Sequence, residues 1–285
     1  MVRKLIKYDF HSYIRLLLPV QLILIGIAAI NRIVQLFEPA ANQVAMTSAN
    51  GRYTGISGSG VYHTVFISSI VLYVISIIVC LVITAIVAVR RFYQGMYTNE
   101  GYLNHTLPVT PTQHIFAKLL TSLIFTVGSL FAIFLSFIVI TVGDMNIEIF
   151  KAFFYIMGDY FKVYGGQTAL YILEAIVLVI VFCSFFYLKL YCCISIGQLA
   201  QKKKVLLAFG VFFGIYVIKQ IIGTILIITV FNNYDLMAQI SDWIAKNATA
   251  YLHILLCSAI AFSVIFGLIY FLITKHIMSK KLNLN

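Results

Sequence analysis

Residues 65–89 read VFISSIVLYVISIIVCLVITAIVAV, an uninterrupted apolar run that contains no charged side chain. A spanning helix needs about 20 predominantly apolar residues, because the hydrocarbon core of a bilayer is about 30 Å thick. A strand of a transmembrane barrel would instead show about ten residues of alternating polarity. The run therefore predicts a transmembrane helix.

Five further runs have the same character, and short polar breaks separate them. The six predicted spans are residues 16–37, 65–89, 119–142, 169–194, 205–231 and 251–274. Of the 285 residues, 62% are hydrophobic and 10% are charged, whereas soluble domains are about 45–50% apolar and about 25% charged. We therefore predict an all-α polytopic membrane protein, a single transmembrane domain over residues 1–285 with no soluble catalytic domain.

Lysine and arginine gather on alternate sides of the predicted spans. Cytoplasmic flanks carry the excess of these residues, and on this rule both termini and two connecting loops are cytoplasmic. The basic residues on this side are Arg3, Lys4, Lys7, Arg15, Arg90, Arg91, Lys118, Lys202, Lys203, Lys204, Lys275, Lys280 and Lys281. The expected location is the cell membrane. The net charge is +11, and the basic residues that produce it flank the predicted spans. We therefore expect anionic lipid headgroups rather than nucleic acid as partners.

Three segments outside the spans show helical periodicity. Residues 1–15 alternate apolar and basic faces, which predicts an amphipathic elbow helix along the inner leaflet, with an ordinary basic flank as the alternative. Residues 147–161 and 236–244 carry aromatic and apolar stripes. We expect these two to form short helices at the outer interface.

The largest inward loop, residues 90–118, has signals for two helices. A short helix around residues 99–106 must stop at Pro108, because proline disfavours helical geometry in the residue before it. A second helix then begins, with Thr110 as cap, Pro111 in the first turn and Gln113 completing a capping box. This loop suits docking of a cytosolic partner; the alternative is a plain re-entry turn.

Residues 99–110 read NEGYLNHTLPVT, and they follow a basic amphipathic N-terminus, a span, an outer loop and a second span. In this order and in this motif the chain resembles permease subunits of type-2 ABC exporters from Gram-positive bacteria. The resemblance implies that the inward loop is a coupling helix that docks on a nucleotide-binding subunit. The matching positions are Glu100, Gly101, Tyr102, Leu103, Thr106, Leu107 and Pro108. The outer loops are too short for the large extracellular domain found in one branch of these exporters.

The resemblance also implies partners and a mechanism. A second permease, identical or a sister chain, would complete the path, and the partner ATPase would bind ATP and Mg²⁺. Closure of the ATPase pair would move the loop as a lever, tilt spans one, two and five, and export an amphipathic or hydrophobic peptide, drug or lipid by alternating access. The sequence itself has no GxxxxGK[ST] loop, HExxH, GxSxG or paired Cys/His cluster. We therefore expect no enzymatic activity, cofactor or metal in this chain; a membrane-embedded enzyme is a weaker alternative.

Three charged residues, Glu174, Lys189 and Lys219, fall inside predicted spans. Such charges are rare and usually face a bundle interior or a cavity. Lys189 and Glu174 lie near span ends and are able to snorkel, whereas Lys219, beside Gln220, lies at the middle of the fifth span. Lys219, Gln220 and Glu174 are therefore candidates for a translocation path or an intramembrane ion pair. A secondary transporter or channel that uses Lys219 and Glu174 is the alternative function, although matching glycine- or proline-interrupted spans are not found.

Overall fold

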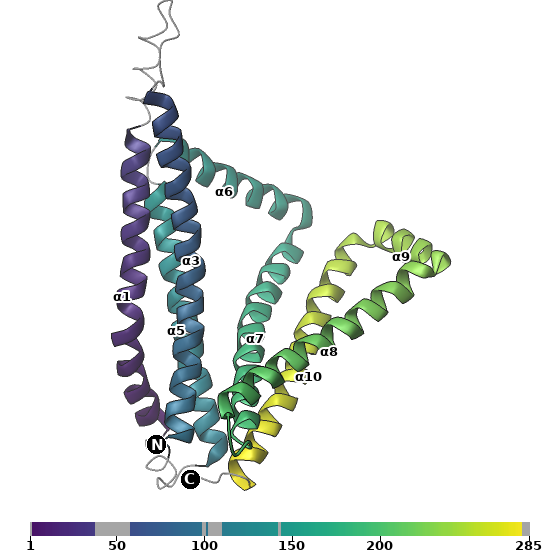
Figure 1. Cartoon of the computed structure of the whole chain (residues 1–285). Helices are drawn as coiled ribbons and strands as arrows, with labels where there is room; N and C mark the ends of the chain where they lie inside the picture. Colours follow the sequence, from purple (N-terminus) through teal and green to yellow (C-terminus); the bar gives the residue numbers. More distant parts are fainter. Residues whose placement is uncertain (1, 38–57, 99–100, 102–109, 142–143, 281–285) are drawn as a thin grey trace, which may run out of the picture. The chain divides into compact units, whose positions relative to one another are not determined.

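The computed structural model describes residues 2–37, 58–98, 101, 110–141 and 144–280, and all regular structure there is helical (Figure 1). The helices are α1 (Val2–Leu36), α3 (Gly58–Tyr97), α5 (Pro111–Thr141), α6 (Asp144–Tyr164), α7 (Gly166–Gly197), α8 (Lys204–Asn232), α9 (Tyr234–Lys246) and α10 (Ala248–Lys280). Six of them, α1, α3, α5, α7, α8 and α10, are long and apolar enough to cross a membrane. The predicted all-α polytopic membrane protein with six spans is confirmed.

The N-terminal amphipathic segment is the first part of α1 and not a separate helix. α1 runs without a break from Val2 to Leu36 and includes Pro19. The sequence between residues 15 and 19 has no glycine or polar turn that would end a helix. The segment expected as an elbow is therefore continuous with the first span.

The two aromatic stripes between spans form helices, as predicted. α6 covers residues 147–161, and α9 covers residues 236–244. Asp235 lies in the first turn of α9 and Lys246 in its last turn, so both charges are favourable to the helix dipole. These helices connect α5 to α7 and α8 to α10.

The chain forms two compact units, and the first, unit A, comprises Arg3–Ala88 and Ile124–Tyr160. Within it the side chains of α1, α3 and α5 are joined by hydrogen bonds. Ser129, which is fully buried on α5, accepts a bond from Gln21 Nε2 at 3.1 Å and pairs with Thr84 Oγ1 at 2.9 Å. Hydrogen bonds and close packing drive helix association in lipid, since tails are as apolar as the helices. Ser129 therefore connects all three helices at one level.

Two further contacts of unit A lie at other levels. Asn31 Nδ2 donates to the carbonyl oxygen of Ser69 at 2.7 Å, and Ser69 Oγ donates to Asn31 Oδ1 at 2.9 Å. The ring of Tyr13 stacks on Phe125 with centroids 4.8 Å apart. Unit A is thus held by a small set of polar and aromatic pairs.

Replacing Ser129 by alanine should lower the thermal stability of the purified protein, because Gln21 and Thr84 both lose an interhelical partner. Interhelical hydrogen bonds average about 0.6 kcal/mol and reach about 1.7 kcal/mol, so we expect a loss in that range. Labelling of the buried thiols by a maleimide dye during heating measures it. Ser68→Ala is the control, because the exposed Ser68 bonds only within its own helix, to the carbonyl of Val65; equal losses from both variants would contradict the assignment.

The second unit, unit B, comprises Met1–Val2, Val89–Leu123 and Phe161–Asn285. α7 packs along α10 and against α8. α8 diverges from α7 after their connecting turn, and α9 links its far end to α10 (Figure 1). No residue of α8 is buried, so its apolar surface is available to lipid.

The turn between α7 and α8 brings the two helices very close together. A Cβ added at Gly197 would lie 2.7 Å from Ala208 Cβ and 2.8 Å from the carbonyl oxygen of Lys204. Only glycine allows this approach. Lys203 adopts a left-handed conformation with φ of 57°, which reverses the chain into α8.

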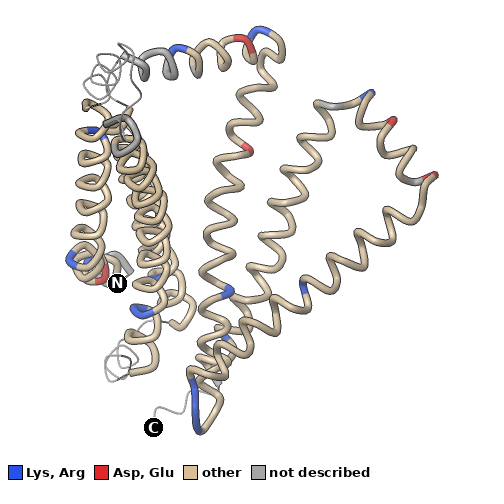
Figure 2. Tube along the Cα trace, turned by 45° about the horizontal axis from the view of Figure 1, so that its top comes forward, with Lys and Arg blue, Asp and Glu red and all other residues tan. Residues whose placement is uncertain are grey.

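Charge in unit B is divided between its two ends. Basic positions gather at the α7–α8 turn, whereas α9 at the other end carries both acidic and basic positions (Figure 2). The turn contains Lys202, Lys203 and Lys204, and α9 contains Asp235, Asp242 and Lys246. This is the distribution on which the expected orientation rests.

Candidate functional site

The predicted coupling loop connects α3 to α5, and most of its motif lies outside the described residues. This applies to Glu100, Tyr102, Leu103, Thr106, Leu107 and Pro108. Gly101 is described and buried; its N–H donates to the carbonyl oxygen of Thr98 at 2.8 Å. A Cβ at Gly101 would lie 2.6 Å from the carbonyl carbon and oxygen of Met96. Glycine is therefore required where the chain folds back on the end of α3.

The two helix ends that flank this loop are joined to the end of α7 in unit B. Tyr97 Oη, on the last residue of α3, donates to Ser195 Oγ at 2.7 Å. The ring of Phe92 stacks on Tyr191 with centroids 3.9 Å apart and an angle of 10° between planes. Tyr191 Oη pairs with Ser122 Oγ on α5 at 2.8 Å. We call these five residues, Phe92, Tyr97, Ser122, Tyr191 and Ser195, the loop base.

Burial makes the loop base a rigid contact. Phe92, Tyr191 and Ser195 are completely buried, and Ser122 is 1% exposed. Buried hydroxyl groups that have partners on other elements fix side-chain orientation, because leaving them unpaired is costly. The described ends of α3 and α5 are therefore held against the end of α7.

The start of α5 has the predicted capping geometry. Pro111 is its first residue, and the N–H of Thr110 donates to Gln113 Oε1 at 3.1 Å. The glutamine half of the predicted capping box is thus present. The second helix of the inward loop begins where the sequence indicated.

The intramembrane lysines both lie over aromatic rings. Lys189 Nζ is 4.2 Å from the ring centroid of Phe212, and Lys219 Nζ is 5.4 Å from that of Phe185 and 5.7 Å from that of Phe262. Desolvated cation–π contacts contribute about 2 kcal/mol, while a lysine at the centre of a spanning helix costs about 2.5–3.5 kcal/mol. The rings therefore offset a large part of the insertion cost.

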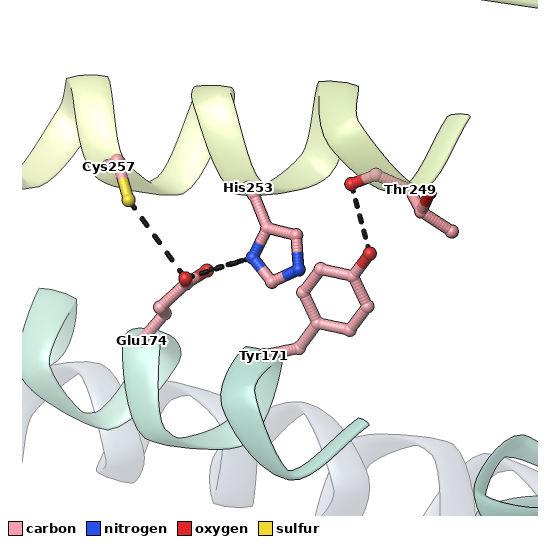
Figure 3. Close-up of polar contacts among 5 residues, drawn as sticks. All are labelled: Tyr171, Glu174, Thr249, His253 and Cys257. Atoms are coloured by element: carbon pink, nitrogen blue, oxygen red, sulfur yellow. Dashed lines mark hydrogen bonds and ion pairs between the residues drawn. The ribbon is translucent and has the colours of Figure 1, made fainter. Parts of the chain in front are cut away.

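Among the described residues, Glu174 is paired with a histidine and not with a lysine. On α7 its carboxylate oxygens lie 2.9 and 3.0 Å from His253 Nδ1 of α10 (Figure 3). The ring of Tyr171 stacks on His253 at 4.2 Å, and its hydroxyl donates to the carbonyl oxygen of Thr249 at 3.0 Å. Cys257 Sγ lies 3.9 Å from Glu174 Oε1. The cluster joins α7 to α10.

The predicted site residues are thus distributed over separate places in unit B. Lys219 and its exposed neighbour Gln220 lie on α8, and Glu174 belongs to the histidine cluster. Sequence reasoning did not identify His253 as a partner or Tyr191 as an anchor. The contacts of Lys189 with Phe212 and of Lys219 with Phe185 join different helices, so spacing within one helix gave no signal for them.

Comparison of the chain with family models, with curated proteins and with solved structures gave no match.

The Glu174–His253 pair should show energetic coupling in a double-mutant cycle. With Glu174→Gln and His253→Gln, thermal unfolding of the purified protein should give an interaction energy of about 0.5–3 kcal/mol, the usual range for residues in contact. A cycle between Glu174→Gln and His276→Gln on the same helix, α10, is the control. His276 lies 23 positions further along α10 than His253, so these effects should add within about 0.5 kcal/mol. Additive effects in both cycles would contradict an interaction between Glu174 and His253.

Proposed function

We propose that the chain is the membrane permease subunit of a type-2 ABC exporter in the cell membrane, with both termini cytoplasmic. It acts with a cytosolic ATPase subunit and with a second permease, either a copy of itself or a sister chain. The exported compound is amphipathic or hydrophobic. Six apolar spanning helices and the motif at residues 99–110 support this proposal.

The loop base is the observation that carries the proposal. A coupling loop is useful only if motion of a docked partner reaches the spanning helices. The α3 and α5 ends that flank the loop contact the last two turns of α7 through Tyr97, Phe92 and Ser122. A force applied to the loop has a direct route into the fourth span.

The described contacts of the loop base lead to α7, the fourth span. The proposal therefore adds α7 to spans one, two and five, which the lever is expected to tilt. α7 in turn packs along α10 and against α8. In the proposed cycle, closure of the ATPase pair displaces the loop and α7 transfers that displacement to α8 and α10.

Charge reversal at Glu100 combined with a bulky change at Leu103, Glu100→Lys with Leu103→Trp, should break the docking contact. Purified from its native membrane, the unmodified chain should bring along an ATP-hydrolysing subunit, and the double variant should lose it while helical circular dichroism stays unchanged. A wild-type preparation with no ATP-hydrolysing companion, or a variant that retains it fully, would count against the docking assignment.

Loss of the Tyr97–Ser195 bond should weaken transmission without removing the ATPase. A buried hydrogen bond contributes about 0.5–1.5 kcal/mol, so in Ser195→Ala the ATP-dependent change in labelling of the exposed Cys257 should fall about two- to tenfold, in a background without the other cysteines. ATP hydrolysis should continue. Ser184→Ala is the matched control, because Ser184 lies on α7 and bonds only to Ile180 of its own helix. An unchanged labelling response in Ser195→Ala would contradict the route.

A proton-coupled secondary transporter is the second candidate, and the Glu174–His253 pair favours it. Paired carboxylate and imidazole groups inside spans are typical of proton relays. The structure does not pair Glu174 with Lys219, so the coupling site of this alternative is the histidine cluster. Export that continues without ATP and stops when the proton gradient is dissipated would support this candidate over the ABC exporter.

A further inference from the structure

Lys219, the lysine of α8, is held at membrane depth. Lys219 lies 15 residues after Lys204 and 13 before Asn232, the two ends of α8, which is about 22 Å and about 20 Å along the helix. Snorkelling brings a lysine to an interface only near a helix end. The ammonium group of Lys219 therefore stays in the hydrocarbon region.

The aromatic contacts of Lys189 and Lys219 are reciprocal across the α7–α8 interface. Phe185 and Lys189 share a face of α7, and Phe212 and Lys219 share a face of α8, because residues four or seven positions apart line up on a helix. Each lysine lies over the phenylalanine of the other helix. Lys219 also reaches Phe262 of α10. The charges are thus directed into the seam between α7, α8 and α10.

The aromatic rings do not satisfy all the N–H donors of the two ammonium groups. Each ammonium group has three N–H donors, and a ring face contacts it from one side only. Among the described residues, no carboxylate lies within 4.0 Å of either nitrogen, and neither nitrogen has a hydrogen-bond acceptor. A bound anion would supply these acceptors.

We propose that Lys189 and Lys219 bind the carboxylate or phosphate headgroup of an anionic amphiphile in the seam of α7, α8 and α10. The hydrocarbon tail of the ligand lies on the apolar surface of α8, where Ile222, Ile225 and Leu226 are each more than half exposed. The positive charges of the two lysines favour an anionic headgroup. The apolar face of α8 favours a ligand with a hydrocarbon tail that enters from the bilayer. An inorganic anion lacks the tail and binds poorly.

The proposal that this site binds an anionic amphiphile does not require ATP-driven export. The proposal that the bound amphiphile is the exported substrate rests on the proposed export function. If the chain is an exporter, the site narrows its cargo from amphipathic compounds in general to anionic ones. If it is not, the same residues hold an anionic lipid or fatty acid as a bound component of the membrane protein.

Binding is tested with the full chain in phosphatidylcholine nanodiscs, without ATP or any partner. The probe is 11-(dansylamino)undecanoic acid, whose fluorescence increases in an apolar site. Its methyl ester, which has no negative charge, is the control ligand. We expect the acid to bind at least tenfold more tightly than the ester. Lys189→Gln with Lys219→Gln should abolish this preference, and the double arginine variant should retain it.

Lys246→Gln on α9 is the control for a general loss of positive charge, and it should leave the preference unchanged. Competition by oleate or by phosphatidylglycerol identifies the ligand as a free fatty acid or a lipid, and displacement of the probe by either supports the site. Equal affinity for acid and ester, or a preference that survives the double glutamine variant, would overturn it. If the acid binds but ATP does not drive its export from vesicles containing the whole complex, the substrate role fails and the site remains.

Discussion

Backbone amides and carbonyls have no water partner inside a bilayer, so each spanning segment must satisfy them within itself. This constraint makes all six spans of the chain helices. It also leaves side chains to determine how those helices pack, because lipid tails are as apolar as the helix surfaces and the hydrophobic effect contributes little between spans. Specific packing therefore comes from a few polar and aromatic residues, of which Ser129 in unit A and Tyr191 in unit B are fully buried examples.

The contacts between helices are neutral in unit A and include a charged side chain in unit B. α1, α3 and α5 are joined within unit A by hydrogen bonds between neutral side chains, which hold at any pH at which the protein is folded. α8 in unit B has no buried residue and is attached through the close turn at Gly197 and through the rings around its lysine. The attachment of α8 therefore includes a charged side chain, which an anionic ligand at the proposed site would neutralise.

The helices could be predicted because they depend on local sequence. The residues that each helix contacts on other helices could not be predicted. The spans follow from run length, and α6 and α9 follow from amphipathic stripes. α8 and α10 are apolar on all sides, so their sequences do not indicate which face meets a neighbour. For this reason the pairing of Glu174 with His253, 79 positions away, was not predicted, nor were the rings beside Lys219. Of the seven positions matched to the family's coupling helix, only Gly101 lies in the described part of the chain.

α7 carries Glu174 toward one end, Lys189 further along and Tyr191 with Ser195 at the other end. A helix advances about 100° per residue, which places Tyr191 about 200° around the axis from Lys189, on the opposite side of the rod. Rolling α7 about its own axis therefore carries the stacked ring and the ammonium group in opposite directions. In the proposed cycle, torque applied at Tyr191 would therefore turn Lys189 without any bending of the backbone of α7.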